Sequence, residues 1–124
     1  MCYQVNTTFL KIIFTMSYKR IGEIWLAEFV FEDNPNIKKK RPVLILENGF
    51  ASVFSAKITS HSPRQNALGE YEIIKWKEAG LLFQSTIRLS KIIRIQDADF
   101  YQKLGNLQEV DLLNVLKIIK RMNN

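Results

Sequence analysis

Cysteine and histidine are almost absent from this sequence, which holds one of each, Cys2 and His61. A single cysteine cannot form an internal disulfide, and neither residue type occurs at the paired spacing of a zinc site. The composition therefore excludes a disulfide-rich or zinc-stabilised scaffold, and it fits the reducing cytoplasm.

Long hydrophobic runs are also missing. The longest one near the N-terminus, residues 9–14, is interrupted by Lys11 and is far shorter than the about 20 residues of a membrane span. It lacks the preceding positive charge and the small-residue cleavage site of a signal peptide. Met16 precedes the first well-patterned segment. We therefore expect residues 1–15 to be an upstream extension or a disordered N-terminus, and residues 16–124 to form a single domain.

Acidic residues are fewer than basic ones, with 12 Asp and Glu against 18 Lys and Arg, a formal charge of +6 and a pI near 9.6. Such a balance suits a polyanionic partner, because Lys and Arg displace counterions from a phosphate backbone. Four of the cations are consecutive, from Lys38 to Arg41. For the three lysines, an ordinary solvated charge run is an equally good interpretation.

The first half of the sequence predicts strands. Residues 22–31 are rich in aromatic and branched side chains, which favours a strand, and the turn-forming residues of 32–40 favour an exposed loop. Proline suits the start of a strand but not its middle. We therefore expect Pro42 to open a strand over residues 43–46, joined by a turn to a second strand over residues 51–58 in a hairpin.

The second half predicts further short elements. A polar loop over residues 60–69 comes first, and the segments expected after it are strands over residues 70–76, 85–89 and 91–95 and a helical turn over residues 77–80. Asn106 to Glu109 resembles a capping box and precedes an amphipathic helix of about 14 residues. The predicted fold class is mainly β with a C-terminal α-helix, in a small closed or half-open barrel.

Candidate site residues flank the predicted hairpin. Arg41 precedes the proline, and a guanidinium held there can make bidentate contacts to a phosphate. Thr59 and Ser60 follow the second strand, and their hydroxyls can donate to phosphate oxygens, although such residues at strand ends are often caps. His61 beside them is a candidate general base, while a lone loop histidine can equally be an idle surface residue.

The carboxylates are scattered along the chain. Glu32 and Asp33 share one predicted loop, and Glu70 and Glu72 share one face of a predicted strand. A two-metal nuclease needs several converging acids, and no motif of that kind is present. The sequence therefore favours chemistry without a metal or another cofactor.

Five segments, in matching order and spacing, resemble the PemK/MazF toxins of type II toxin–antitoxin systems. They are Gly22-Glu23-Ile24-Trp25-Leu26, Lys40-Arg41-Pro42-Val43-Leu44-Ile45-Leu46, Ile58-Thr59-Ser60, Gly80-Leu81-Leu82 through Ser85 to Ile92, and Leu104-Gly105-Asn106-Leu107. The similarity covers residue 22 to about residue 120. Members of this family are small homodimeric SH3-like barrels, of a type shared with the CcdB toxins. They cut single-stranded RNA without a metal, and each is restrained by an antitoxin.

The resemblance implies a cytoplasmic, sequence-specific endoribonuclease toxin that cleaves mRNA and thereby arrests translation and growth. It also implies a homodimer with a cognate antitoxin and no membrane association. Arg41 and Thr59 are carried over as the catalytic pair. The positions carried over as substrate-binding are Lys39, Lys40, Ser60, Ser85 and Arg88.

Metal-free RNA cleavage begins when the 2′-hydroxyl attacks the adjacent phosphorus, and it needs a proton acceptor, a proton donor and stabilisation of the phosphorane charge. Because its very high pKa makes arginine a poor general base, we assign Arg41 charge stabilisation and the acid role, and Thr59 the orientation of the phosphate. Ser90 stands where some relatives carry an acid, and residues 32–33 stand where some carry a histidine. His61 is therefore the candidate proton acceptor.

Two other functions stay open from the sequence. A toxin like CcdB would bind DNA gyrase through the end of the terminal helix, around residues 122–124, and would not need Arg41. A plain RNA-binding barrel would bind without cleaving and would expose aromatic stacking residues, whereas Trp25 and Trp76 lie in apolar segments that favour core packing. The preferred RNA sequence cannot be read from one chain.

Overall fold

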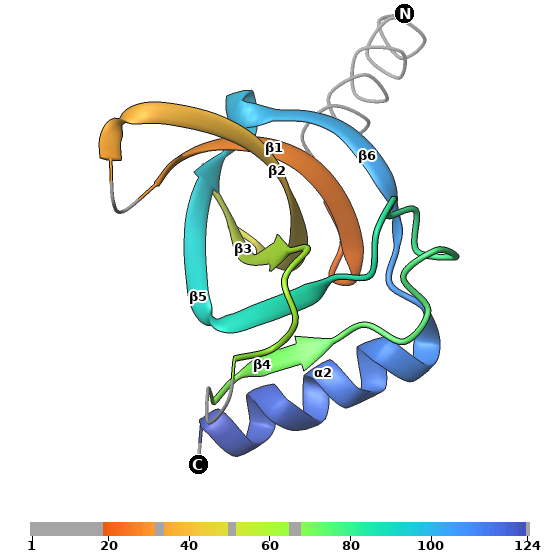
Figure 1. Cartoon of the computed structure of the whole chain (residues 1–124). Coiled ribbons are helices and arrows are strands. Elements are labelled where there is room, and N and C mark those ends of the chain that lie inside the picture. The colour runs from red at the N-terminus through yellow and green to blue at the C-terminus, as the bar shows by residue number, and fades with distance from the viewer. Residues whose placement is uncertain (1–18, 32–33, 50–51, 65–67, 124) are drawn as a thin grey trace, which may run out of the picture.

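The computed structural model describes residues 19–31, 34–49, 52–64 and 68–123, so residues 1–15, predicted to be an extension, lie outside the described part. Six strands, a short 3₁₀ helix and an α-helix make up its regular structure (Figure 1). In chain order they are β1 (Glu23–Phe31), β2 (Asn34–Asn48), β3 (Ser52–Thr59), β4 (Glu70–Glu72), β5 (Thr86–Gln96), η1 (Asp97–Asp99), β6 (Phe100–Asn106) and α2 (Glu109–Met122).

The strands form one antiparallel sheet in the order β4-β5-β3-β2-β1-β6. The sheet is strongly curved, and α2 lies along its lower end beside β4 (Figure 1). Because β4 and β6 end the sheet order and do not pair, the barrel is half-open. The prediction of a mainly β fold with a C-terminal helix is confirmed, as are the strand over residues 22–31 and the β2–β3 hairpin.

The core fills the inside of the curved sheet because apolar side chains alternate along the strands. The main cluster joins residues from four strands, the segment after β4, the link between β6 and α2, and the helix: Ile24, Leu44, Ala56, Ile58, Ile73, Ala79, Leu81, Ile87, Leu89, Leu107 and Val115. Trp76 packs against this cluster, and Trp25 packs against a smaller one with its ring edge-on to Phe100 at 6.0 Å. Both tryptophans therefore serve packing, as the sequence predicted.

A buried carboxylate joins α2 to the rest of the fold. Asp111 is fully buried, and its oxygens accept hydrogen bonds from the Tyr71 hydroxyl at 2.6 Å and from the backbone N–H groups of Ile74 and Lys75, both at 2.9 Å. Because these two N–H groups donate to a helix side chain, they do not pair with another strand. This explains why β4 ends at Glu72 and not at residue 76 as predicted.

The predicted capping box is wrong. Asn106 is still the last residue of β6, where it pairs with Glu23, and the helix begins only at Glu109, after Gln108. The N-cap residue Gln108 makes no capping hydrogen bond with its side chain, which donates instead to the backbone carbonyl of Asn106. The helix length of 14 residues agrees with the prediction.

The predicted loop over residues 32–40 is also wrong from residue 34 onward, because β2 starts there and pairs with β1. Pro42 consequently lies inside β2, opposite Leu26, and does not open a strand. Pairing of β2 with β3 begins only at Val43. At Pro42 one side of β2 has no strand neighbour, and a proline is tolerated at such an edge position.

The two strands predicted over residues 85–89 and 91–95 are the arms of the single bent strand β5. On β3, Ala56 pairs with Ile92 but the next residue, Lys57, pairs with Arg88, so residues 89–91 form a bulge. Bulges bend a strand without ending it. Strand β6 was not predicted, and the expected helical turn is part of a longer turn over residues 74–80.

That turn touches β6 backbone to backbone. A Cβ atom on Gly80, whose φ is +95°, would lie 2.1 Å from the carbonyl oxygen of Leu104, and one on Gly105 would lie 2.1 Å from that of Ala79. Only glycine fits such an approach. The contact fixes the start of the segment that leads to Ser85. In the described ranges, no helix is long and apolar enough to cross a membrane.

Candidate active site

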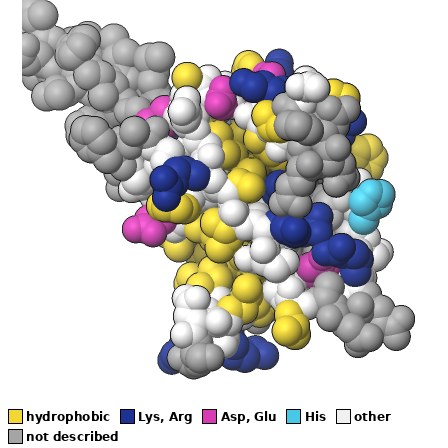
Figure 2. Space-filling view, turned by 90° about the vertical axis from the view of Figure 1, so that its left-hand side faces the viewer, with side chains coloured by type: hydrophobic (Ala, Val, Ile, Leu, Met, Phe, Trp, Pro, Cys, Tyr) yellow, Lys and Arg dark blue, Asp and Glu magenta, His cyan; other side chains and the backbone are white. Residues whose placement is uncertain are grey.

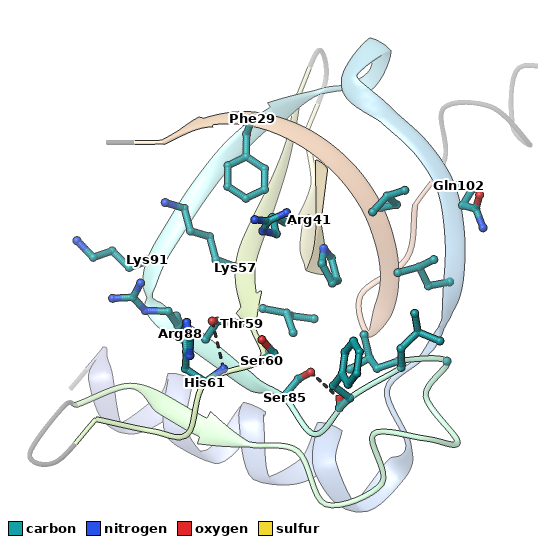
Figure 3. A pocket seen from close by; sticks show the side chains of 18 of the residues that line it. Phe29, Arg41, Lys57, Thr59, Ser60, His61, Ser85, Arg88, Lys91 and Gln102 are labelled. Atoms are coloured by element: carbon teal, nitrogen blue, oxygen red, sulfur yellow. Dashed lines mark hydrogen bonds between the residues drawn. The ribbon is translucent and has the colours of Figure 1, made fainter. Parts of the chain in front are cut away.

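A cavity of about 980 Å³ opens at the mouth of the half-open barrel. It is lined by side chains from β1, β2, β3, β5 and β6 and by the segments on either side of β4. Six of the eight predicted site residues line it: Arg41, Thr59, Ser60, His61, Ser85 and Arg88. Figure 3 shows Arg41 among the strands, with Thr59, Ser60 and His61 at the end of β3.

The pairing of β3 with β5 determines which of their side chains line the cavity. Alternate residues of a strand share a face, so Lys57 and Thr59 on β3 both face the cavity. Lys57 is directly opposite Arg88 on β5, and Thr59 is opposite Thr86. The prediction missed Lys57, although the one charged residue of this strand, two residues before Thr59, was a usable signal.

The cavity wall is strongly basic. Its described lining contains five Lys and Arg side chains and the histidine, and it contains no Asp or Glu. Three of these cations were absent from the predicted site: Lys57, Arg64 and Lys91. Figure 2 shows Lys and Arg side chains gathered on this side of the molecule beside the histidine, around hydrophobic side chains. A concave surface of one charge sign concentrates ligands of the opposite sign.

A buried carboxylate holds two of the arginines from behind. The Glu70 side chain is only 2% exposed. It accepts hydrogen bonds from the Arg64 backbone N–H at 2.8 Å and from that guanidinium at 2.9 and 3.0 Å, and Arg88 Nε lies 3.4 Å away. These contacts, chiefly the backbone N–H of Arg64, lower the pKa of Glu70 below its usual range, although burial opposes them. The carboxylate therefore stays charged, holds the Arg64 guanidinium by two hydrogen bonds and pairs with the charge of Arg88.

The hydroxyls in the cavity have distinct partners. Thr59 Oγ1 accepts a hydrogen bond from the backbone N–H of His61 at 3.4 Å, so its own hydrogen can be donated to a ligand. Ser85 Oγ donates to the backbone carbonyl of Phe83 at 2.8 Å (Figure 3). Ser85 thus supports the neighbouring loop, and its oxygen can still accept.

Arg41 belongs to β2 and is exposed, with Nη1 donating to the carbonyl of Lys40 at 3.0 Å. Because β2 and β3 are neighbours in the sheet, Arg41 and Thr59 reach the cavity from adjacent strands. Such an arrangement can hold one phosphate between a guanidinium and a hydroxyl.

Lys39 and Lys40 do not join this group, because neither lines the cavity. They are exposed on β2, opposite β1, where the Lys40 ammonium lies 4.1 Å from the ring centroid of Tyr101. Ser90 is exposed on the bulge of β5, and residues 32–33 lie outside the described part of the chain. Among the described residues, no three His, Cys, Asp or Glu side chains gather as metal ligands would.

Comparisons with known proteins agree on the fold. The family model described as PemK-like, MazF-like toxin of type II toxin–antitoxin system matches residues 20–122. No curated protein matches the sequence. Among solved structures, a mycobacterial endoribonuclease in complex with its cognate antitoxin superposes with a TM-score of 0.65 at 12% identity, over 83% of this chain and 92% of that one. The Mycobacterium tuberculosis toxin MazF-mt6 superposes with a TM-score of 0.62 at 24% identity, over 80% and 93%.

Proposed function

The chain belongs to the PemK-like, MazF-like toxins of type II toxin–antitoxin systems, and from this premise we propose that it is a metal-independent endoribonuclease. It would cut single-stranded RNA at short sequences in the cytoplasm and so arrest translation and growth. The observation that carries the proposal is the joint presence of Arg41 and Thr59 in a cavity whose described lining is basic and free of carboxylates.

The cavity suits a reaction in which the RNA supplies its own nucleophile. The 2′-oxygen forms a bond to phosphorus, the bond to the 5′-oxygen breaks, and the products are a 2′,3′-cyclic phosphate and a 5′-hydroxyl. Arg41 stabilises the added negative charge, and Thr59 donates its hydrogen to a non-bridging oxygen. His61 takes the proton of the 2′-hydroxyl and Arg41 gives one to the leaving oxygen, after which solvent water carries a proton from His61 back to Arg41.

The other basic residues of the cavity have a binding role in this proposal. Arg88, held by Glu70, and Lys57 on the facing strand contact the phosphates that flank the cleaved bond. Ser60 and Ser85 contact the nucleotide between them, and Lys39 and Lys40 steer the backbone from outside the cavity. Electrostatic contacts of this kind add affinity that falls as salt rises.

A cognate antitoxin and a second copy of the chain are the proposed protein partners. The similar endoribonuclease solved with its antitoxin supports the first, since an acidic segment would complement the basic cavity. For the second, α2 exposes Val110, Leu113 and Leu116, which a second copy can cover. Co-purification with the product of an adjacent short gene, and the mass of the purified protein in solution, test these two partners.

Cleavage of single-stranded RNA in the presence of a chelator tests the proposed activity. Wild type should cut, and Arg41→Ala should lose about 100- to 1,000-fold in rate, the usual effect of removing one charge-stabilising donor. Arg121→Ala is the matched control, because Arg121 is exposed at the end of α2, outside the cavity. Inhibition of DNA gyrase by an Arg41→Ala variant, or RNA binding without any product, would favour the other two functions.

A further inference from the structure

One loop of the cavity wall exposes large apolar side chains. Leu82 and Phe83 line the cavity, yet they are 84% and 67% exposed, and Phe83 is the most exposed large aromatic side chain in the described part of the chain. An apolar ring left in water is unfavourable unless a ligand covers it.

The exposure does not come from a loosely attached segment. Before the loop, the backbone N–H of Leu81 donates to the Trp76 carbonyl at 3.0 Å, and the Leu81 side chain is buried in the core. After it, Ser85 Oγ donates to the carbonyl of Phe83 itself at 2.8 Å, and the Ser85 carbonyl accepts from the backbone N–H of Ile73 at 2.9 Å. The fold therefore holds the Phe83 backbone firmly while its ring faces outward.

The other aromatic rings in or near the cavity already have partners within the protein. Phe29 also lines the cavity, but it is half-buried, with the Lys57 ammonium 5.4 Å from its ring centroid. Trp25 is packed edge-on against Phe100. Tyr101 donates its hydroxyl to Glu28 outside the cavity. Among these rings, that of Phe83 is the one that lines the same cavity as the cations and is mostly exposed.

We propose that Phe83 is a stacking platform for one unpaired nucleobase of the RNA and is a specificity-determining residue, an inference that rests on the proposed endoribonuclease function. A flat ring beside phosphate-binding cations matches a nucleotide, whose base and phosphate need these two surfaces together. A purely apolar partner would not use the basic wall. The Ser85 oxygen, hydrogen-bonded to the same loop, can accept from the edge of the stacked base.

The test combines Phe83 variants with a substrate that lacks single bases. An RNA oligonucleotide cut by wild type is made with one abasic nucleotide at each position in turn. Phe83→Ala should raise KM about 5- to 100-fold, as expected for the loss of one base–aromatic stack, whereas Phe83→Trp should stay within about 3-fold of wild type. At one position, the abasic nucleotide should raise the KM of wild type by the same factor. At that position it should not raise the KM of Phe83→Ala any further.

Two controls separate stacking from general damage. Ile74→Ala removes a side chain that is 62% exposed outside the cavity and should leave KM unchanged. Phe83→Leu keeps an apolar group without a ring and should resemble Phe83→Ala. Losses that add at every abasic position, or a wild-type KM for Phe83→Ala, would overturn the platform. So would a Phe83→Ala variant that weakens only antitoxin binding or self-association.

A binding measurement keeps this inference distinct from the proposed cleavage. Fluorescence anisotropy compares a base-bearing RNA with a fully abasic strand of the same length. If wild type binds the base-bearing RNA more tightly but cuts neither strand, and Phe83→Ala lacks that preference, the platform stands and the nuclease proposal fails. If wild type cuts RNA but Phe83→Ala keeps the preference, the platform fails and the nuclease stands. If wild type binds no RNA, both fail.

Discussion

Two buried carboxylates in this molecule do different work with similar hydrogen bonding. Glu70, behind the cavity wall, accepts from the backbone N–H and the guanidinium of Arg64 and forms an ion pair with Arg88, and both arginines line the cavity. Asp111, under the C-terminal helix, accepts from Tyr71 and from the backbone of residues 74–75. The partners of Glu70 line the cavity, whereas those of Asp111 only attach the helix to the rest of the fold. A carboxylate paired with cations can set the electrostatics of a site, whereas one with only neutral donors mainly fixes the chain.

Replacing Asp111 by alanine should have the largest effect, and on stability alone. The change leaves a hydroxyl and two partly buried N–H groups without their acceptor, so the free energy of unfolding should fall by about 3 kcal/mol. Urea unfolding measures it. Glu109→Ala, at an exposed position in the same helical turn, should change stability by less than about 0.5 kcal/mol. An equal loss in both variants would remove the contrast between the two carboxylates.

Glu70→Gln should instead act mainly on catalysis. The amide cannot supply the charge that holds Arg64 and Arg88, so kcat/KM for RNA should fall about 10-fold, about 1.4 kcal/mol. Glu72→Gln, at an exposed position on the same strand, is the control and should cut like wild type. If Glu70→Gln is destabilised as much as Asp111→Ala but cuts normally, the role of Glu70 is structural, like that of Asp111.

The ionisation of Glu70 should also affect how the free energy of unfolding changes at acid pH. Because its pKa is lowered in the folded state, chiefly by the Arg64 backbone N–H, its contribution is present above the usual glutamate pKa and disappears as pH falls through the lowered one. The difference in unfolding free energy between wild type and Glu70→Gln should be constant from about pH 7 to pH 5 and shrink below about pH 4.3. A difference that does not change with pH would contradict this.

The hydrogen bond between Tyr71 and Asp111 should affect how the free energy of unfolding changes at alkaline pH. Burial, together with the hydrogen bond to Asp111, raises the pKa of Tyr71 to about 12. A raised pKa stabilises the fold below the unfolded value, near about pH 10, and that stability is lost as pH rises toward 12. Tyr71→Phe should cost about 1.5 kcal/mol at neutral pH, and its difference from wild type should vanish in alkali. A difference that persists at high pH would place the stabilisation elsewhere.

The smallest expected effect separates two lysines. Lys57 lines the cavity, so Lys57→Ala should lower RNA affinity about 5- to 10-fold and reduce its salt dependence by about one counterion. Lys40 contacts Tyr101 outside the cavity, and Lys40→Ala should cost less than about 3-fold. Affinity titrations at several salt concentrations measure both. Equal losses would extend the RNA-binding surface along β2.

Local patterns in the sequence predicted the elements that depend on local preference. The alternation before Phe31 and the apolar face of α2 both gave correct elements. Elements that depend on a partner strand were missed or misjudged. Residues 34–40 look like a polar loop but are held as a strand by β1, and the continuity of β5 rests on the bulge where it pairs with β3.

The candidate site divides in a similar way. Arg41, Thr59 and His61 were named from motifs and neighbours along the chain, and the fold brings them to one cavity. The pairing of Lys57 with Arg88, and the position of Glu70 behind that wall, follow from strand register across more than a dozen residues. A single sequence does not reveal that register, so Lys57 and Glu70 were not predicted as site residues, and the pairing of Lys57 with the predicted Arg88 was not foreseen.

A single 2′-deoxy substitution in the RNA tests the central claim most directly. In chelator, wild type should cut an all-RNA oligonucleotide to a 2′,3′-cyclic phosphate and a 5′-hydroxyl. It should leave intact the same strand with deoxyribose at the nucleotide whose 2′-hydroxyl attacks, and Arg41→Ala should cut neither at a comparable rate. Cleavage of the deoxy-substituted strand, or wild-type cleavage by Arg41→Ala, would contradict the account.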